Sequence, residues 1–197
     1  LNYDANTATA GAAIAVPAAA NAEATAIAST AGSALVDSSR GILGVAAGRS
    51  ADQPGRAAVI VYVDPSKPLP TIPQTLQGLP TVVIPSTAAQ VASGSAPRML
   101  AVRPGIHLPQ ATLNTAVGIH DRYAAQIMTD PAFFGVGVTQ SQDDPSQAAL
   151  LVFVDITKTP RSQPATIGGL RVRYKPLHRI RITLATRHVA MGGVMAR

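Results

Sequence analysis

Two long apolar runs dominate the hydropathy pattern of the chain. The run AAVIVYVD ends at Asp64, and the run ALLVFVD ends at Asp155. Almost unbroken hydrophobicity over this length is typical of a strand that is covered on both faces of a sheet. The sequence therefore predicts central, fully buried strands at residues 59–63 and 150–154.

These runs belong to a segment that occurs twice in the chain. Residues 44–67 return as residues 135–158, at an offset of 91 positions without a gap. Over residues 44–85 the alignment has 16 identities in 42 positions, and several of them are glycines and prolines that set backbone shape. The pattern indicates a duplicated structural unit, so the two copies should superpose with Gly44 on Gly135, Val63 on Val154 and Pro85 on Pro176.

The remaining elements follow from helical periodicity and turn residues. An Ala-rich helix is expected over residues 17–36, with Pro17 in its first turn. Its counterpart is expected to end at Pro131, with an apolar face formed by Leu113, Val117, His120, Ala124, Ile127 and Met128. The turns SADQPGR and SQDDPSQ carry Asp and Pro as reverse turns require. Short helical turns at PQTLQG and PATIGG would precede a third strand in each unit.

The expected fold class is α+β, with two tandem αββαβ units that each consist of a small sheet packed by a helix. Later strands are expected at residues 99–103 and 178–184. The expected organisation is an N-terminal arm at 1–16, a first unit at 17–92, a linker at 93–109, and a second unit with basic C-terminal strands at 110–197.

The amino-acid composition limits which kinds of core and surface the protein can have. Only 13% of the 197 residues are charged, against roughly 25% in ordinary domains, and 4% are aromatic. The core must therefore consist of small aliphatic side chains, and neighbours can cover the weakly charged surface at low desolvation cost. The absence of cysteine excludes disulfides and thiol chemistry. No apolar stretch reaches the roughly 20 residues of a membrane span.

The net charge of +6 is concentrated at the C-terminus, where residues 171–197 contain seven Lys or Arg and no acid. Strand alternation would place these side chains on one face, as a candidate polyanion strip for nucleic acid, acidic polysaccharide or anionic lipid. The alternative, which we favour, is a solvated face that prevents an edge strand from pairing wrongly. The strip consists of Arg171, Arg173, Lys175, Arg179 and Arg181.

Motifs that carry catalysis or ligand binding are missing from the sequence. There is no nucleophile elbow, no H-x-x-x-H pair and no phosphate-binding glycine loop. His120 precedes Asp121 on a helix, where adjacent side chains point to different sides. Asp143 and Asp144 suit a turn better than a calcium site, and Asp64 and Asp155 suit caps of the turns that follow them. We therefore assign no catalytic, cofactor-binding or metal-binding residue and expect no cofactor.

The succession of helix, GVGV, an apolar strand ending in Asp, a Pro-rich link and P-x-x-[LI]-x-G-L resembles a repeat region found N-terminal to trypsin-like peptidase domains in some secreted bacterial proteins. The resemblance covers most of both units. It implies secretion and a non-catalytic module. No Gly-Asp-Ser-Gly-Gly stretch is present, so the resemblance carries over no catalytic residue.

These observations favour a secreted, non-enzymatic structural protein that assembles with copies of itself into an extracellular filament or cell-surface structure. The start at Leu1 fits a removed leader or a trimmed chain. The connector would be the arm, whose apolar positions Ala10, Ala12, Ile14 and Val16 could add to a sheet edge of another copy; the alternative is an arm packed on its own helix. A secreted interaction or inhibitor-like module is the alternative function.

Overall fold

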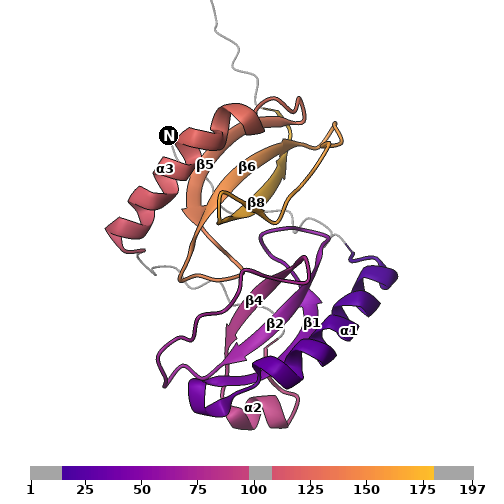
Figure 1. Ribbon diagram of the computed structural model, residues 1–197. Helices are drawn as coiled ribbons and strands as arrows, with labels where there is room; N and C mark the ends of the chain where they lie inside the picture. The colour runs from indigo at the N-terminus through magenta and orange to yellow at the C-terminus, as the bar shows by residue number, and fades with distance from the viewer. Residues whose placement is uncertain (1–14, 98–107, 180–197) are drawn as a thin grey trace, which may run out of the picture.

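The computed structural model of the protein describes residues 15–97 and 108–179 (Figure 1). Most of the predicted arm, the strand expected at 99–103 and most of the strand expected at 178–184 lie outside these residues. Here the first unit means residues 15–97 and the second unit means residues 108–179.

Both units have the same order of elements and the same sheet topology. The first contains α1 (Ala18–Leu35), the 3-10 helix η1 (Ser38–Arg40), β1 (Ile42–Arg49), β2 (Ala57–Val63), β3 (Thr75–Leu76), β4 (Leu79–Pro85) and α2 (Ala88–Ala92). The second contains α3 (Gln110–Ile127), β5 (Phe133–Gln140), β6 (Ala148–Asp155), β7 (Thr166–Ile167) and β8 (Leu170–Leu177). The sheets run β1-β2-β4-β3 and β5-β6-β8-β7. The predicted α+β class with two similar units is confirmed.

Strand pairing shows that the duplication is preserved residue by residue. Val45 pairs with Val61 in the antiparallel β1–β2 ladder, and Val136 pairs with Val152 at the same positions of the second unit. Both ladders carry a bulge at their start, next to Gly44 and Gly135 respectively. In the parallel ladders Val63 pairs with Pro85, and Val154 pairs with the matching Pro176. The predicted superposition of the two copies therefore holds for topology and register.

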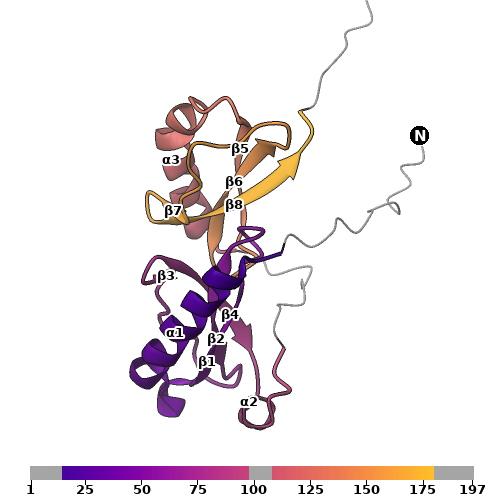
Figure 2. The same ribbon diagram turned by 90° about the vertical axis from the view of Figure 1, so that its right-hand side faces the viewer.

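The central strands are buried as the apolar runs predict. All seven residues of β2 are buried, and β6 is buried at six of its eight positions. One face of the first sheet packs on α1, where the sheet meets Ala24, Ile27 and Ala28. On the other face, around Ile60, the sheet packs in part against Val91 and Ala96 of the α2 segment, which lies beside one end of the sheet (Figure 2).

Two expectations about the helices were wrong. The segments at PQTLQG and PATIGG are not helical turns, because the short strands β3 and β7 turn directly into β4 and β8. Gln77 and Gly78, like Gly168 and Gly169, have positive φ, which is the backbone of a tight two-residue hairpin. On α3 the buried residue is Ala116, while Val117 and Met128 are 47% and 41% exposed. The helix approaches the sheet over the small alanine, so the buried face is rotated from the predicted one.

Within the described residues no helix is long and apolar enough to cross a membrane.

Candidate functional site

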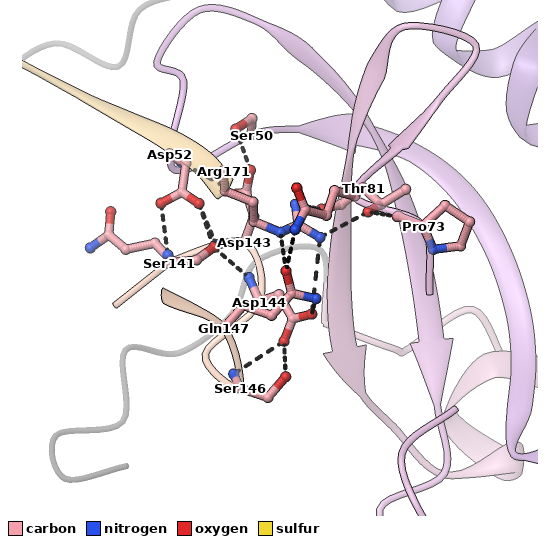
Figure 3. Close-up of polar contacts among 12 residues, drawn as sticks. Ser50, Asp52, Pro73, Thr81, Ser141, Asp143, Asp144, Ser146, Gln147 and Arg171 are labelled. Carbon is pink, nitrogen blue, oxygen red and sulfur yellow. Dashed lines mark hydrogen bonds and ion pairs between the residues drawn. The ribbon is translucent and has the colours of Figure 1, made fainter. Parts of the chain in front are cut away.

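Among the residues that the structure describes, the most extensive cluster of buried polar groups lies where the two units meet. The turn between β1 and β2 projects from the first unit, and the matching turn between β5 and β6 projects from the second (Figure 3). Each turn carries Ser-x-Asp at its tip, with Asp52 in one and Asp143 in the other. The two aspartates are 91 positions apart, so they are equivalent residues of the duplicated unit.

Asp52 binds the turn of the second unit. Its Oδ1 accepts a hydrogen bond from the Gln142 N–H at 2.7 Å, and its Oδ2 accepts one from the Ser141 hydroxyl at 2.5 Å. The Asp143 N–H lies 3.4 Å from the same Oδ2. The carboxylate of Asp52 therefore caps three consecutive residues of the opposite turn.

Asp143 makes the reciprocal contacts to the turn of the first unit. Its Oδ1 accepts hydrogen bonds from the N–H groups of Ala51 and Asp52, at 2.6 and 3.3 Å, and its Oδ2 accepts one from the Ser50 hydroxyl. Donors of the same type at equivalent positions thus serve both carboxylates. The contact has an approximate two-fold relationship, as in the interface of a symmetric dimer.

Backbone hydrogen bonds extend this exchange to the sheets. The N–H of Val83 in β4 donates to the carbonyl of Asp143, and the N–H of Tyr174 in β8 donates to the carbonyl of Asp52, both at 2.8 Å. Val83 and Tyr174 are again equivalent positions. Each turn therefore satisfies a backbone donor on a strand of the other unit, which removes part of an otherwise unpaired edge.

Burial dominates the electrostatics of the aspartate pair. Asp52 is 2% exposed and Asp143 is 1% exposed. Burial raises the pKa of both carboxyl groups, and it raises the pKa of Asp143 to about 6 with a further contribution from the negative charge of Asp52. The turn donors and the more distant Arg171 oppose the increase, because they stabilise the ionised forms.

Arg171 breaks the symmetry of the junction and corrects the predicted polyanion strip. It is 2% exposed, and its guanidinium donates to the Thr81 carbonyl at 2.7 Å, to the Thr81 hydroxyl at 3.0 Å and to Gln147 at 3.3 Å. Asp144 lies 4.0 Å from the same guanidinium. The first unit has Pro80 at the equivalent position, so sequence alternation alone could not show that this arginine points into the other unit.

The other strip residues differ in exposure. Arg173 is partly buried, whereas Lys175 and Arg179 are exposed. Arg181 lies outside the described residues, as do Ala10, Ala12 and Ile14 of the predicted arm. Val16, the last arm residue, packs against the apolar cluster beneath α1 of its own chain.

The predictions for the single Asp and His side chains have different outcomes. Asp64 and Asp155 do cap the turns that follow them, through Ser66 and Thr157 respectively. The expectation that His120 and Asp121 point apart was wrong, since His120 Nδ1 lies 2.9 Å from Asp121 Oδ1 on the exposed side of α3. Among residues 15–97 and 108–179, no three His, Asp or Glu side chains gather as a metal site would require.

The junction is built to hold the two units together. The acceptor atoms of both aspartates receive donors from the opposite turn, and the serine hydroxyls beside them donate to carboxylates. Sequence reasoning explained Ser50, Asp52, Ser141 and Asp143 only as turn formers. The signal that could have identified them is the recurrence of Ser-x-Asp at the 91-residue offset, where the residue between differs.

Comparisons with known proteins identify no family for this fold and junction. No protein-family model, no curated protein and no solved structure matches the chain.

Proposed function

We propose that the protein is a secreted, non-enzymatic structural protein that assembles with copies of itself into an extracellular filament or cell-surface structure. The buried polar residues of the described chain support this proposal, because the largest such cluster is used to join the two units. A two-unit body joined in this way suits a subunit that must keep its shape within an assembly.

The observation that carries the proposal is that each sheet has a long outermost strand, β1 in the first unit and β5 in the second. Strands β1 and β5 are eight residues long, and each lies beside another strand on one side only within the described residues, apart from one bridge between Asp37 and Ile42. The sequence of β5, FFGVGVTQ, contains no charge. Native sheets commonly protect such edges with charges or proline, so an uncharged edge is suited to accept a strand from another molecule.

We propose that residues 1–14 supply that strand to a neighbouring copy. Ala10, Ala12 and Ile14 alternate as an added strand requires, whereas Val16 stays on its own unit as the structure places it. Donation of a strand from each copy to the next is a head-to-tail contact, which gives an open filament unless the ring closes.

Two variants test the proposal without disturbing the core. The first deletes residues 1–14 and keeps Val16. The second is Gly137→Lys, which adds a charge to β5 at a glycine whose side-chain direction is open space. Gly118→Lys on α3 is the matched control, because a side chain there is equally unobstructed.

Electron microscopy and light scattering then report assembly. We expect filaments or sheets from the wild type and from Gly118→Lys, and loss of assembly with an intact fold from the deletion and from Gly137→Lys. Normal assembly of the deletion variant would exclude the arm as connector. A wild-type protein that stays a monodisperse monomer would overturn self-assembly and favour the alternative, a secreted interaction or inhibitor-like module.

An acidic polymer is a further proposed partner. Lys175 and Arg179 are exposed at the end of β8, with Arg173 partly exposed beside them. The positive charges of these three side chains would attract a polyanion at low ionic strength.

A further inference from the structure

The second unit contains a hollow between α3 and its sheet that differs in character from the matching region of the first unit. The hollow has a volume of about 320 Å³ and is walled by Tyr123, Phe133 and Tyr174, together with Ile127, Val152 and Ile167. These are three of the seven aromatic residues of the whole chain, which has four Tyr and three Phe. Aromatic side chains are therefore concentrated at one place in a protein that otherwise uses few of them.

The duplication shows how this hollow arises. In the first unit Ile72 is buried in a cluster with Ile42, Val61 and Val83, the positions that match Phe133, Val152 and Tyr174. The residue that matches Ile72 is Gln163, which is exposed. The apolar side chain that fills this space in the first unit is thus missing in the second, and the space beside Val152 and Tyr174 stays open.

A second difference lies on the helix. Gly32 of α1 is matched by Tyr123 of α3, and a side chain at Gly32 would come within 3.9 Å of Val45 on β1. Tyr123 instead reaches the β7–β8 hairpin, where its ring leaves no space for a side chain at Gly168. Tyr123 therefore forms a wall of the hollow at a position where the first unit brings helix and strand together.

The charged groups of the lining determine which ligand the hollow suits. Asp130 and Arg161 both line it, and they carry opposite charges. The Asp130 oxygens already accept the N–H groups of Ala132 at 2.9 Å and Arg161 at 2.7 Å, while the Tyr174 hydroxyl donates to the Pro164 carbonyl at 3.0 Å. The lining consequently presents stacked aromatic and aliphatic surface without a net charge. Phe133 and Tyr174 have ring centroids 6.0 Å apart, a spacing typical of stacked aromatic pairs.

We propose that this hollow is a binding site for a flat, uncharged aromatic ligand of one or two rings. Its volume is at the lower end of the range of about 300 to 1,000 Å³ for small-molecule sites. The hollow is open to solvent and exposes aromatic and aliphatic surface, and a planar ligand would bury that surface and gain dispersion contacts with it. The first unit has a separate hollow of about 640 Å³ that shares the Ile42 position, but Val61 and Val83 do not line it and no aromatic side chain does, so the site belongs to the second unit.

The test uses three probes of one shape and different charge: 2-naphthol, 2-naphthoate and 2-naphthylmethylammonium. Binding to the full chain is measured at neutral pH by calorimetry and by ligand-observed magnetic resonance. We expect 2-naphthol to bind more tightly than either ion. Preference for one of the ions would overturn the assignment of an uncharged ligand, and no binding of any probe at millimolar concentration would overturn the site.

Two variants of the hollow and one control variant in the first unit locate the binding. Ile167→Trp should fill the hollow and abolish 2-naphthol binding, whereas Leu76→Trp, the same change at the matching residue of the first unit, should leave it intact. Tyr123→Leu keeps an apolar helix residue but removes a ring, and it should weaken binding about fivefold to tenfold. Circular dichroism confirms that each variant is folded. Binding that is unchanged in both folded Ile167→Trp and folded Tyr123→Leu would place the probe elsewhere and refute the site.

Discussion

Asp52 and Asp143 each accept hydrogen bonds from the turn that carries the other. The relationship is reciprocal because the two turns are copies of one sequence, and each copy supplies both an acceptor and the donors for the opposite copy. Each aspartate therefore has two roles, since its side chain caps one turn while its own backbone N–H is capped in return. A change at either position affects both units.

Removal of one carboxylate should destabilise the whole protein. Asp143→Ala leaves the Ser50 hydroxyl and the Ala51 N–H without their acceptor in a buried junction. We expect the free energy of unfolding to fall by about 2 to 4 kcal/mol, the combined cost of buried donors left unpaired. Urea denaturation measures the change. Asp121→Ala, on the exposed side of α3, is the control and should change stability by no more than about 0.5 kcal/mol. Equal stability of the two variants would show that the junction contributes little.

The raised pKa of Asp143 predicts how stability depends on pH. Its pKa is about 6 in the folded protein, above the ordinary value of 3.8, so the folded state binds the proton more tightly than the unfolded chain does. The stability from this group is fully present below pH 3.8 and is lost as the pH rises through about 6. Asp64 and Asp155, whose pKa values are lowered, have the opposite effect and act below pH 3.8.

Denaturation of the wild type and of Asp143→Asn between pH 4 and pH 7 isolates this effect. We expect the free energy of unfolding of the wild type to fall across this interval relative to the variant, which has no carboxyl group at position 143 to titrate. Parallel curves for the two proteins would contradict the raised pKa. The two proteins are compared by how steeply the free energy of unfolding changes with pH. A loss of stability in the variant that is the same at every pH does not alter this slope.

The sequence predicted the duplicated elements well because their signals are local and repeated. The apolar runs identified β2 and β6, and the gapless offset predicted the shared register of Val61 and Val152. The junction could not be predicted in the same way. The pairing of Asp143 with Ala51 joins residues about 90 positions apart, and the burial of Arg171 depends on Thr81 of the other unit. Both are tertiary contacts that alternation within one strand does not encode.

The two central strands should be equally sensitive to truncation. Val61 and Val152 are both fully buried and occupy equivalent positions in β2 and β6. Substitution of either by Ala removes two methyl groups from the core, which should cost on the order of 1 to 3 kcal/mol. Val117→Ala makes the same chemical change on the exposed face of α3 and should have a far smaller effect. Thermal or urea unfolding of the three variants is the measurement. If Val152→Ala were as stable as the wild type, Val152 would not lie in the core and β6 would not be a central buried strand.

The burial of Arg171 separates a structural arginine from those able to bind a polyanion. Its guanidinium donates to Thr81 and Gln147 inside the junction, whereas Lys175, two pleats further along β8, is exposed. Lys175→Gln should therefore weaken binding to heparin, used as the probe polyanion, by about twofold to fivefold, because exposed charge pairs contribute about 0.2 to 1 kcal/mol. The loss should shrink as salt is added.

Arg171→Gln should instead lower the free energy of unfolding by about 3 kcal/mol, since Asp144 would lose its buried positive neighbour. Heparin binding of the protein that remains folded should match that of the wild type. Both variants remove one positive charge, so net charge alone predicts the same loss of heparin affinity in each, and only the different exposure of the two side chains predicts a difference. Equal weakening of heparin binding by the two folded variants would mean that Arg171 reaches the surface and that the strip inferred from strand alternation is intact.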